Sequence, residues 1–227
     1  MPTSIADALD SVRQRIAAAA ARSGRPAEAV TLVAVSKTFP PAAVAEAVAA
    51  GQRVFGENKV QEGLEKIPLL PADLEWHLIG HLQSNKIRKA LPLFHWIETV
   101  DSLERARQID RVASELSCRP RILLQVNIGN DDAKYGYAPD ALRADFEDLV
   151  ALPHLDVRGL MTILPIESDP TRTRAHFARL CTLRGELESR GGRPLPELSM
   201  GMSQDYEMAI EEGATLVRVG SAIFGGR

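Results

Sequence analysis

Residues 31–41 read Thr-Leu-Val-Ala-Val-Ser-Lys-Thr-Phe-Pro-Pro, and this stretch carries the basic unit of the fold. Its first six residues form a short apolar run rich in β-branched side chains, which is typical of a buried strand. Lys37 follows where the strand gives way to a loop. Pro41 then opens an alanine-rich segment to Ala50, which predicts a helix with proline in its first turn.

The same alternation of strand and helix continues along the chain. Further strands are expected at 53–56, 75–79, 94–99, 121–128, 157–163, 195–200 and 215–219. Helices are expected between them at 59–66, 84–91, 103–116, 139–151, 172–189 and 204–212, and an amphipathic helix at 4–23 precedes the first strand. Parallel strands need crossover connections, so this α/β pattern predicts a parallel sheet.

Eight such units in 227 residues predict a (β/α)8 TIM barrel with a leading N-terminal helix. An open, doubly wound sheet is the alternative. Pro139 occupies a first-turn position, and Gly51, Gly191 and Gly213 follow expected helix ends, where a left-handed residue is favoured. No linker or low-complexity tract interrupts the pattern, so residues 1–227 are expected to form a single domain.

Composition narrows the class of protein. The chain is 45% hydrophobic and 25% charged, with a formal net charge of -3, which gives no reason to expect nucleic-acid binding. Its two cysteines, Cys118 and Cys181, form no CxxC pair, which suits a reducing compartment. The apolar part of the N-terminal helix is too short to span a bilayer or to act as a signal peptide. We therefore expect a cytoplasmic protein with no membrane partner.

Lys37 is the residue with the clearest chemical potential. A lysine at a strand end can be desolvated, which lowers its pKa towards the range where the neutral amine attacks an aldehyde. The alternative is a lysine that marks the strand end and keeps its head in water. In a barrel, however, the loops after the strands carry the chemistry, and Lys37 stands in one of them.

The loops after the last two strands suggest a phosphate site. Ser203 is expected just before a helix, where unpaired N–H groups attract an anion. Gly220 and Ser221 offer close backbone approach, N–H donors and a hydroxyl. Taken singly, Ser203 could be an ordinary helix cap and Gly220 a tight turn. Together, on the two loops that usually hold phosphate in barrels, they favour a phosphorylated ligand.

Strand parity predicts that a second cation lies near Lys37. Val33, Val35 and Lys37 share one face of their strand, and Leu216, Arg218 and Gly220 share one face of theirs. If both faces point into the barrel, Lys37 and Arg218 converge near its mouth, with an electron-rich or anionic ligand between them. The alternative is that Arg218 pairs with a carboxylate elsewhere.

A metal site is a weaker reading of the same loops. His77 and His81 would have to supply ligands for a metal-dependent hydrolase, but a strand-to-loop setting does not place them on one helical face. No third ligand is evident, so we expect no metal.

Six motifs occur in order along nearly the whole chain. They are Ala-Val-Ser-Lys-Thr at 34–38, Phe-Gly-Glu-Asn at 55–58 with Gln61 and Glu62, His-Leu-Ile-Gly-His-Leu-Gln-Ser-Asn-Lys at 77–86, Gly-Leu-Met-Thr at 159–162, Leu-Ser-Met-Gly-Met-Ser-Gln-Asp at 198–205 and Val-Arg-Val-Gly-Ser-Ala-Ile-Phe-Gly at 217–225. In these motifs the chain resembles the pyridoxal 5′-phosphate (PLP) homeostasis proteins, whose fold is similar to the barrel domain of alanine racemase.

The resemblance implies PLP as the cofactor and a role for each matched residue. Lys37 would form a Schiff base with it, and Arg218 would face the pyridine nitrogen. Ser203, Gly220 and Ser221 would hold the phosphate. The remaining pocket residues implied are Asn58, Met200 and Met202.

The function implied is to hold, buffer and deliver PLP in vitamin B6 homeostasis, with no catalysis. The partners would be PLP itself and, if PLP is passed on, apo forms of PLP-dependent enzymes. A low-activity amino-acid racemase is the alternative. Two-base racemisation needs an acid or base on each face of the ring, and Tyr135, Tyr137 and Tyr206 lack the context of a racemase tyrosine. The β-rich second domain of alanine racemases is also missing, so we expect a monomer.

Overall fold

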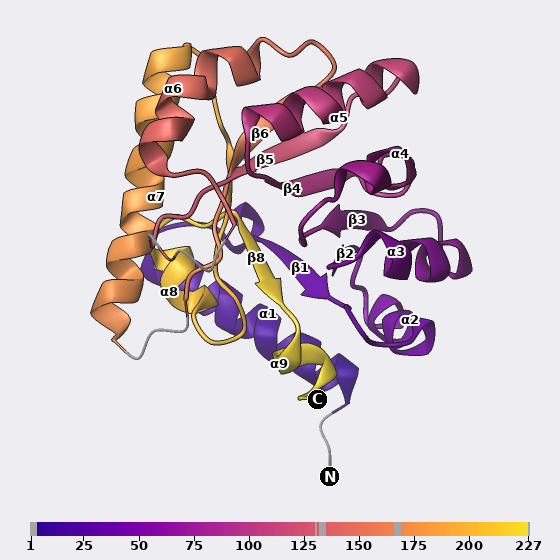
Figure 1. Ribbon diagram of the computed structural model, residues 1–227. Helices are drawn as coiled ribbons and strands as arrows, with labels where there is room; N and C mark the ends of the chain where they lie inside the picture. The colour runs from indigo at the N-terminus through magenta and orange to yellow at the C-terminus, as the bar shows by residue number, and fades with distance from the viewer. Residues whose placement is uncertain (1–3, 130, 132–134, 166–168, 227) are drawn as a thin grey trace.

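A computed structural model describes residues 4–129, 131, 135–165 and 169–226, and it contains a closed parallel barrel (Figure 1). The strands are β1 (Thr31–Val35), β2 (Val54–Glu57), β3 (Glu75–Leu78), β4 (Trp96–Val100), β5 (Arg121–Gln125), β6 (Asp156–Met161), β7 (Glu197–Ser199) and β8 (Leu216–Val219). β1 closes the barrel by pairing in parallel with β8, from Thr31 opposite Leu216 to Ala34 opposite Val219. The predicted barrel is confirmed, and the open sheet is excluded.

Helices surround the strands on the outside of the barrel (Figure 1). They are α1 (Ile5–Arg22), α2 (Pro41–Ala49), α3 (Val60–Lys66), α4 (Ile87–Ala90), α5 (Leu103–Glu115), α6 (Pro139–Val150), α7 (Pro170–Gly191), α8 (Tyr206–Glu211) and α9 (Ser221–Phe224). Short 3-10 turns occupy Ala27–Ala29, Ile67–Leu69 and Ser84–Lys86. Within the described ranges, no helix is long and apolar enough to cross a membrane.

The leading helix α1 packs on the outside of the barrel, against other helices. Ser4 caps it by accepting a hydrogen bond from the Asp7 backbone N–H. Its buried stripe, which includes Leu9, Val12 and Ile16, packs against α2, α8 and α9. The helix therefore supports the part of the barrel where β8 and β1 meet.

The barrel interior and the outer core are separate apolar clusters. The interior cluster contains Val33, Trp96, Leu123, Met161 and Leu216. Alternate residues on the same strands, such as Ala34, Ile97 and Val217, belong to the outer core under the helices. This arrangement places Val33 and Leu216 inside the barrel, as strand parity predicts.

Several element ends differ from the expected ones. α7 begins at Pro170 and continues through Gly191, and Gly192 is the left-handed residue that ends it, with φ of 60°. The helix expected at 204–212 begins only at Tyr206, because residues 202–205 form a turn first. The helix α9 was not expected. The largest consequence is that Ser203 does not directly precede a helix.

Candidate functional site

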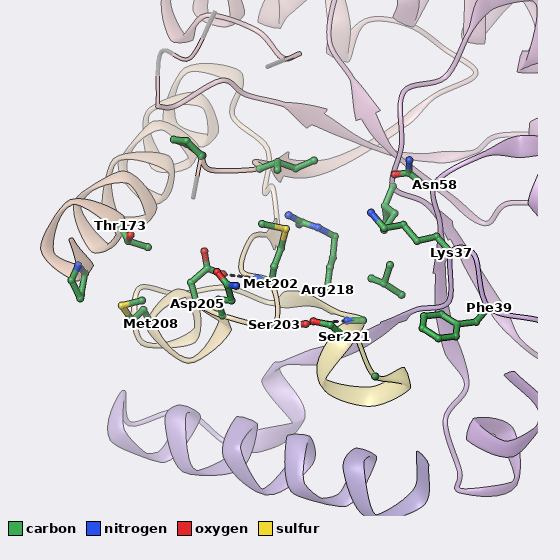
Figure 2. A pocket seen from close by; sticks show the side chains of 18 residues that line it. Lys37, Phe39, Asn58, Thr173, Met202, Ser203, Asp205, Met208, Arg218 and Ser221 are labelled. Atoms are coloured by element: carbon green, nitrogen blue, oxygen red, sulfur yellow. Dashed lines mark hydrogen bonds between the residues drawn. The ribbon is translucent and has the colours of Figure 1, made fainter. Parts of the chain in front are cut away.

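A cavity of about 580 Å³ opens where the carboxyl ends of β1, β7 and β8 meet (Figure 2). Cavities of this size are typical of small-molecule sites. It is lined by seven of the residues predicted from the sequence: Lys37, Asn58, Met202, Ser203, Arg218, Gly220 and Ser221. Met200, the eighth, lies in the apolar core with no exposed surface. Figure 2 shows the Lys37 side chain extending into the cavity that Arg218 also lines.

The backbone around Lys37 is held on both sides. Ser36 donates its N–H to the Gly56 carbonyl and is completely buried. Thr38 has φ of 69°, a left-handed conformation that is strained for a β-branched residue. Its N–H donates to Glu62 Oε2 at 2.7 Å. Strain of this kind gathers at ligand sites, where the surrounding structure enforces it.

A buried ion pair lies behind Ser36. Lys66 on α3 donates from Nζ to Glu57 Oε1 at 2.5 Å and to the Ser36 carbonyl at 2.9 Å. The Ser36 hydroxyl donates to the same carboxylate oxygen at 2.7 Å. Burial raises the pKa of Glu57, although the hydrogen bonds from Lys66 and Ser36 oppose that shift. The group ties α3 to the residue that precedes Lys37.

Arg218 is buried in the cavity wall and fixed at two points. It donates to Ser199 Oγ at 2.6 Å and to the Thr162 carbonyl at 2.7 Å. Ser199 in turn donates to Glu98 Oε2 at 2.5 Å. Burial lowers the pKa of Arg218, while the charges of Glu98 and Asp205 oppose the shift. Arg218 therefore lines the same cavity as Lys37 and also reaches the carboxylate of Glu98 through Ser199.

Asn58 lines the cavity with Lys37, and the backbone at Gly80 packs directly against it. A Cβ atom at Gly80 would lie 2.0 Å from the Asn58 carbonyl oxygen, so only glycine fits there. The loop after β3 thereby packs directly on the loop after β2. The sequence motif at 77–86 contains this glycine, and the close approach to Asn58 explains why a glycine is needed there.

Ser203, Gly220 and Ser221 form one corner of the cavity. The Gly220 N–H donates to Ser203 Oγ at 3.2 Å, which joins the loops after β7 and β8. Ser221 is the first residue of α9, and the first N–H groups of a helix have no partner within it. The two loops for which the sequence predicts a phosphate site therefore lie side by side, and the helix that begins at this corner is α9.

Met202 reaches the cavity because the chain reverses at Gly201. That residue has φ of 92°, and a Cβ atom there would lie 2.6 Å from the Ala209 side chain. The alternation of strand β7 stops at this point, so Met200 stays in the core while Met202 lines the cavity. The adjacent Asp205 accepts the Met202 N–H at 2.6 Å, and burial raises its pKa.

His77 and His81 do not come together. His77 is inside the barrel, with no exposed surface, between Glu75 and Glu98. His81 lies outside, stacked on Tyr135 with ring centroids 4.4 Å apart. In the described part of the chain, no group of three histidine, cysteine or acidic residues is arranged to hold a metal ion.

The sequence profile of the alanine racemase N-terminal domain matches residues 8–227. A curated relative in Escherichia coli (strain K12), named pyridoxal phosphate homeostasis protein, is 44% identical over 98% of this chain and 97% of its own length. The chain belongs to the pyridoxal phosphate homeostasis protein family.

Two solved structures are similar to this chain. PipY of Synechococcus elongatus, in a structure with PLP bound, is 45% identical over 97% of this chain and all of its own, with a TM-score of 0.86. Alanine racemase of Clostridium difficile is 15% identical with a TM-score of 0.75, which shows a shared fold. The match covers 88% of this chain but 56% of that racemase.

Proposed function

We propose that this chain binds PLP and holds it for intracellular vitamin B6 homeostasis. The observation that carries the proposal is that one cavity is lined by Lys37, by Arg218 and by the corner formed by Ser203, Gly220 and Ser221. The PLP-bound PipY structure and the name of the Escherichia coli relative support the same ligand.

The donor set fits the functional groups of PLP. A primary amine at Lys37 can condense with the aldehyde, forming a C=N bond and releasing water. The hydroxyls of Ser203 and Ser221, with nearby backbone N–H groups, suit a phosphate. The guanidinium of Arg218 has five N–H donors and no acceptor, so it suits a ring nitrogen that carries a lone pair.

The same residues favour holding over turnover. Bound PLP supplies a reactive aldehyde and a pyridine ring that acts as an electron sink, strongest when the ring nitrogen is protonated. Arg218 stays charged and can only donate, so it would keep that nitrogen unprotonated. Tyr135, Tyr137 and Tyr206 do not line the cavity, which leaves no tyrosine as a second acid or base for racemisation.

The test compares delivery with catalysis in one preparation. Protein loaded with PLP and freed of excess ligand is mixed with an apo-aminotransferase, and recovery of transaminase activity is followed against the same amount of free PLP. The loaded protein is also incubated with L-alanine in heavy water, and α-deuteration and D-alanine are measured. We expect reactivation without turnover.

Other outcomes would separate the alternatives. Racemisation that disappears in Lys37→Ala would replace the holding function with an enzyme. Failure to reactivate any apo-enzyme would restrict the function to storage of a reactive aldehyde. We also infer that the protein is a monomer, and sedimentation equilibrium tests this directly.

A further inference from the structure

A continuous chain of polar side chains runs through the barrel from the cavity wall. Arg218 donates to Ser199 Oγ at 2.6 Å, and Ser199 donates to Glu98 Oε2 at 2.5 Å. The other oxygen of Glu98 lies 2.6 Å from His77 Nδ1. His77 Nε2 lies 3.1 Å from Glu75 Oε1. These contacts join the carboxyl end of β8 to the first residue of β3, at the opposite mouth.

The chain is sealed from solvent along most of its length. His77, Glu98 and Ser199 have no exposed surface, and Arg218 has 4%. Trp96 stacks on the His77 ring with centroids 5.3 Å apart and covers it from β4. Glu75 is the most exposed member, and it also accepts from Trp96 Nε1 at 3.1 Å and lies 3.4 Å from Arg121. A cluster of this kind in a barrel interior is costly unless its charges balance.

The charges balance when His77 is protonated. Two carboxylates, Glu75 and Glu98, then face two cations, His77 and Arg218. Burial alone would lower the pKa of His77, but its hydrogen bonds to Glu75 and Glu98 raise it above its ordinary value. For Glu98, the contacts with His77, Arg218 and Ser199 outweigh burial, so its pKa is lowered. The other charged groups around this chain are Arg121, beside Glu75, Asp205, near Arg218, and Lys37, which lines the same cavity as Arg218.

We propose that Ser199, Glu98 and His77 are positioning residues that fix the orientation and the charge environment of Arg218. Ser199 and the Thr162 carbonyl hold the two ends of the guanidinium fork, which leaves its other N–H groups for a ligand. Glu98 balances its charge, and protonated His77 keeps Glu98 in place. The part of this inference that concerns the ligand ring rests on the proposed function.

The first test needs no ligand. Nitrogen-15 NMR reports the protonation of the His77 ring and the order of the Arg218 guanidinium in the wild type, Ser199→Ala and Glu98→Gln. We expect a doubly protonated His77 at pH 7 and a slowly exchanging Arg218 Nε–H in the wild type. Ser199→Ala should broaden the Arg218 signal, and Glu98→Gln should lower the titration midpoint of His77.

Thr99→Val is the matched control. Thr99 is the neighbour of Glu98 on β4, and its buried hydroxyl donates to the Gly80 carbonyl at 2.8 Å, away from Arg218. Thr99→Val loses one buried hydrogen bond, whereas Ser199→Ala loses the two that join Arg218 to Glu98, and Thr99→Val should leave both signals unchanged. Equal changes in Thr99→Val and Ser199→Ala, or no change in either test variant, would overturn the proposal.

The second test uses ligand. Ser199→Ala should weaken binding of PLP and of pyridoxal alike by about tenfold, as expected for loss of one hydrogen bond that orients a charged group. A loss confined to PLP would assign Ser199 to phosphate binding and contradict the proposal. If wild-type protein bound neither ligand, the proposed function would fail, while the NMR comparison would still decide whether the chain positions Arg218.

Discussion

Lys66 Nζ lies 2.5 Å from Glu57 Oε1, and both side chains are almost completely shielded from solvent. The pair is joined to Ser36 twice, through its carbonyl and its hydroxyl. Ser36 precedes Lys37, so a buried ion pair between α3 and β2 fixes the strand end that presents Lys37 to the cavity. This pair and the strained Thr38 hold Lys37 from its two sides.

Lys66→Met should therefore destabilise the protein strongly. Removing one partner of a buried ion pair leaves an uncompensated charge, which typically costs about 3–5 kcal/mol. Burial already raises the pKa of Glu57, and loss of Lys66 should raise it further. The native state then holds a proton on Glu57 that the unfolded state releases. The free energy of unfolding therefore falls as pH rises from the pKa of Glu57 in the unfolded chain to its raised pKa in the native state.

Urea unfolding of Lys66→Met at pH 5 and pH 8 checks this, with the larger loss expected at pH 8. The matched control is Lys66→Met with Glu57→Gln, which removes the charge and should recover part of the stability. An equal loss at both pH values, with no recovery in the double variant, would show that Lys66 acts only by filling space.

Thr38→Gly should separate stability from binding. A non-glycine residue with positive φ stores roughly 1–3 kcal/mol of strain, and glycine removes it at an entropic cost of about 0.5–1 kcal/mol. The free energy of unfolding should stay level or rise by about 1 kcal/mol, while a looser Lys37 binds PLP more weakly. Thermal unfolding and absorbance titration measure the two effects.

Ser117→Gly is the control for that substitution. Ser117 also has positive φ, 51°, but it follows α5 and does not line the cavity. It should gain stability without any change in PLP binding. Unchanged binding in Thr38→Gly as well would mean that the strain at Thr38 does not serve Lys37.

Ser203→Ala and Ser221→Ala should each weaken PLP binding while sparing pyridoxal. A hydrogen bond to a charged oxygen is worth roughly 1.5–3 kcal/mol, which corresponds to about one to two powers of ten in affinity. Ser189→Ala, which removes an exposed hydroxyl bonded to the Gly185 carbonyl on α7, is the control. Equal losses for PLP and pyridoxal would place the two hydroxyls at the ring or in the fold.

Strand alternation predicts much of this site. Period-two patterning puts Val33 and Val35 on one side of β1 and Leu216 and Arg218 on one side of β8, and Lys37, two residues beyond the end of β1, also lines the cavity. Met200 was expected at the pocket from the family resemblance and not from parity, and parity turns it towards the outer core because its neighbour Ser199 faces the barrel interior. Strand β7 ends at Ser199, and the left-handed turn at Gly201 sends Met202, and not Met200, towards the cavity.

The polar chain behind Arg218 could not be predicted from local patterns. Glu98 and Ser199 are separated by 101 positions and meet only because β4 and β7 face each other inside a closed barrel. The Lys66–Glu57 pair likewise depends on how α3 packs on β2. Sequence patterns predict which face of a strand a side chain occupies, but contact across the barrel depends on register and closure.

The central claim is that Lys37 is the residue that holds PLP, and one measurement tests it most directly. The protein is loaded with PLP, reduced with borohydride, digested and mapped by mass spectrometry, beside Lys37→Ala treated in the same way. We predict that the phosphopyridoxyl group is found on Lys37, and that Lys37→Ala carries no comparable label even if weak phosphate-anchored binding remains. Stoichiometric label on Lys86 or Lys134, with Lys37 unmodified, would contradict the account.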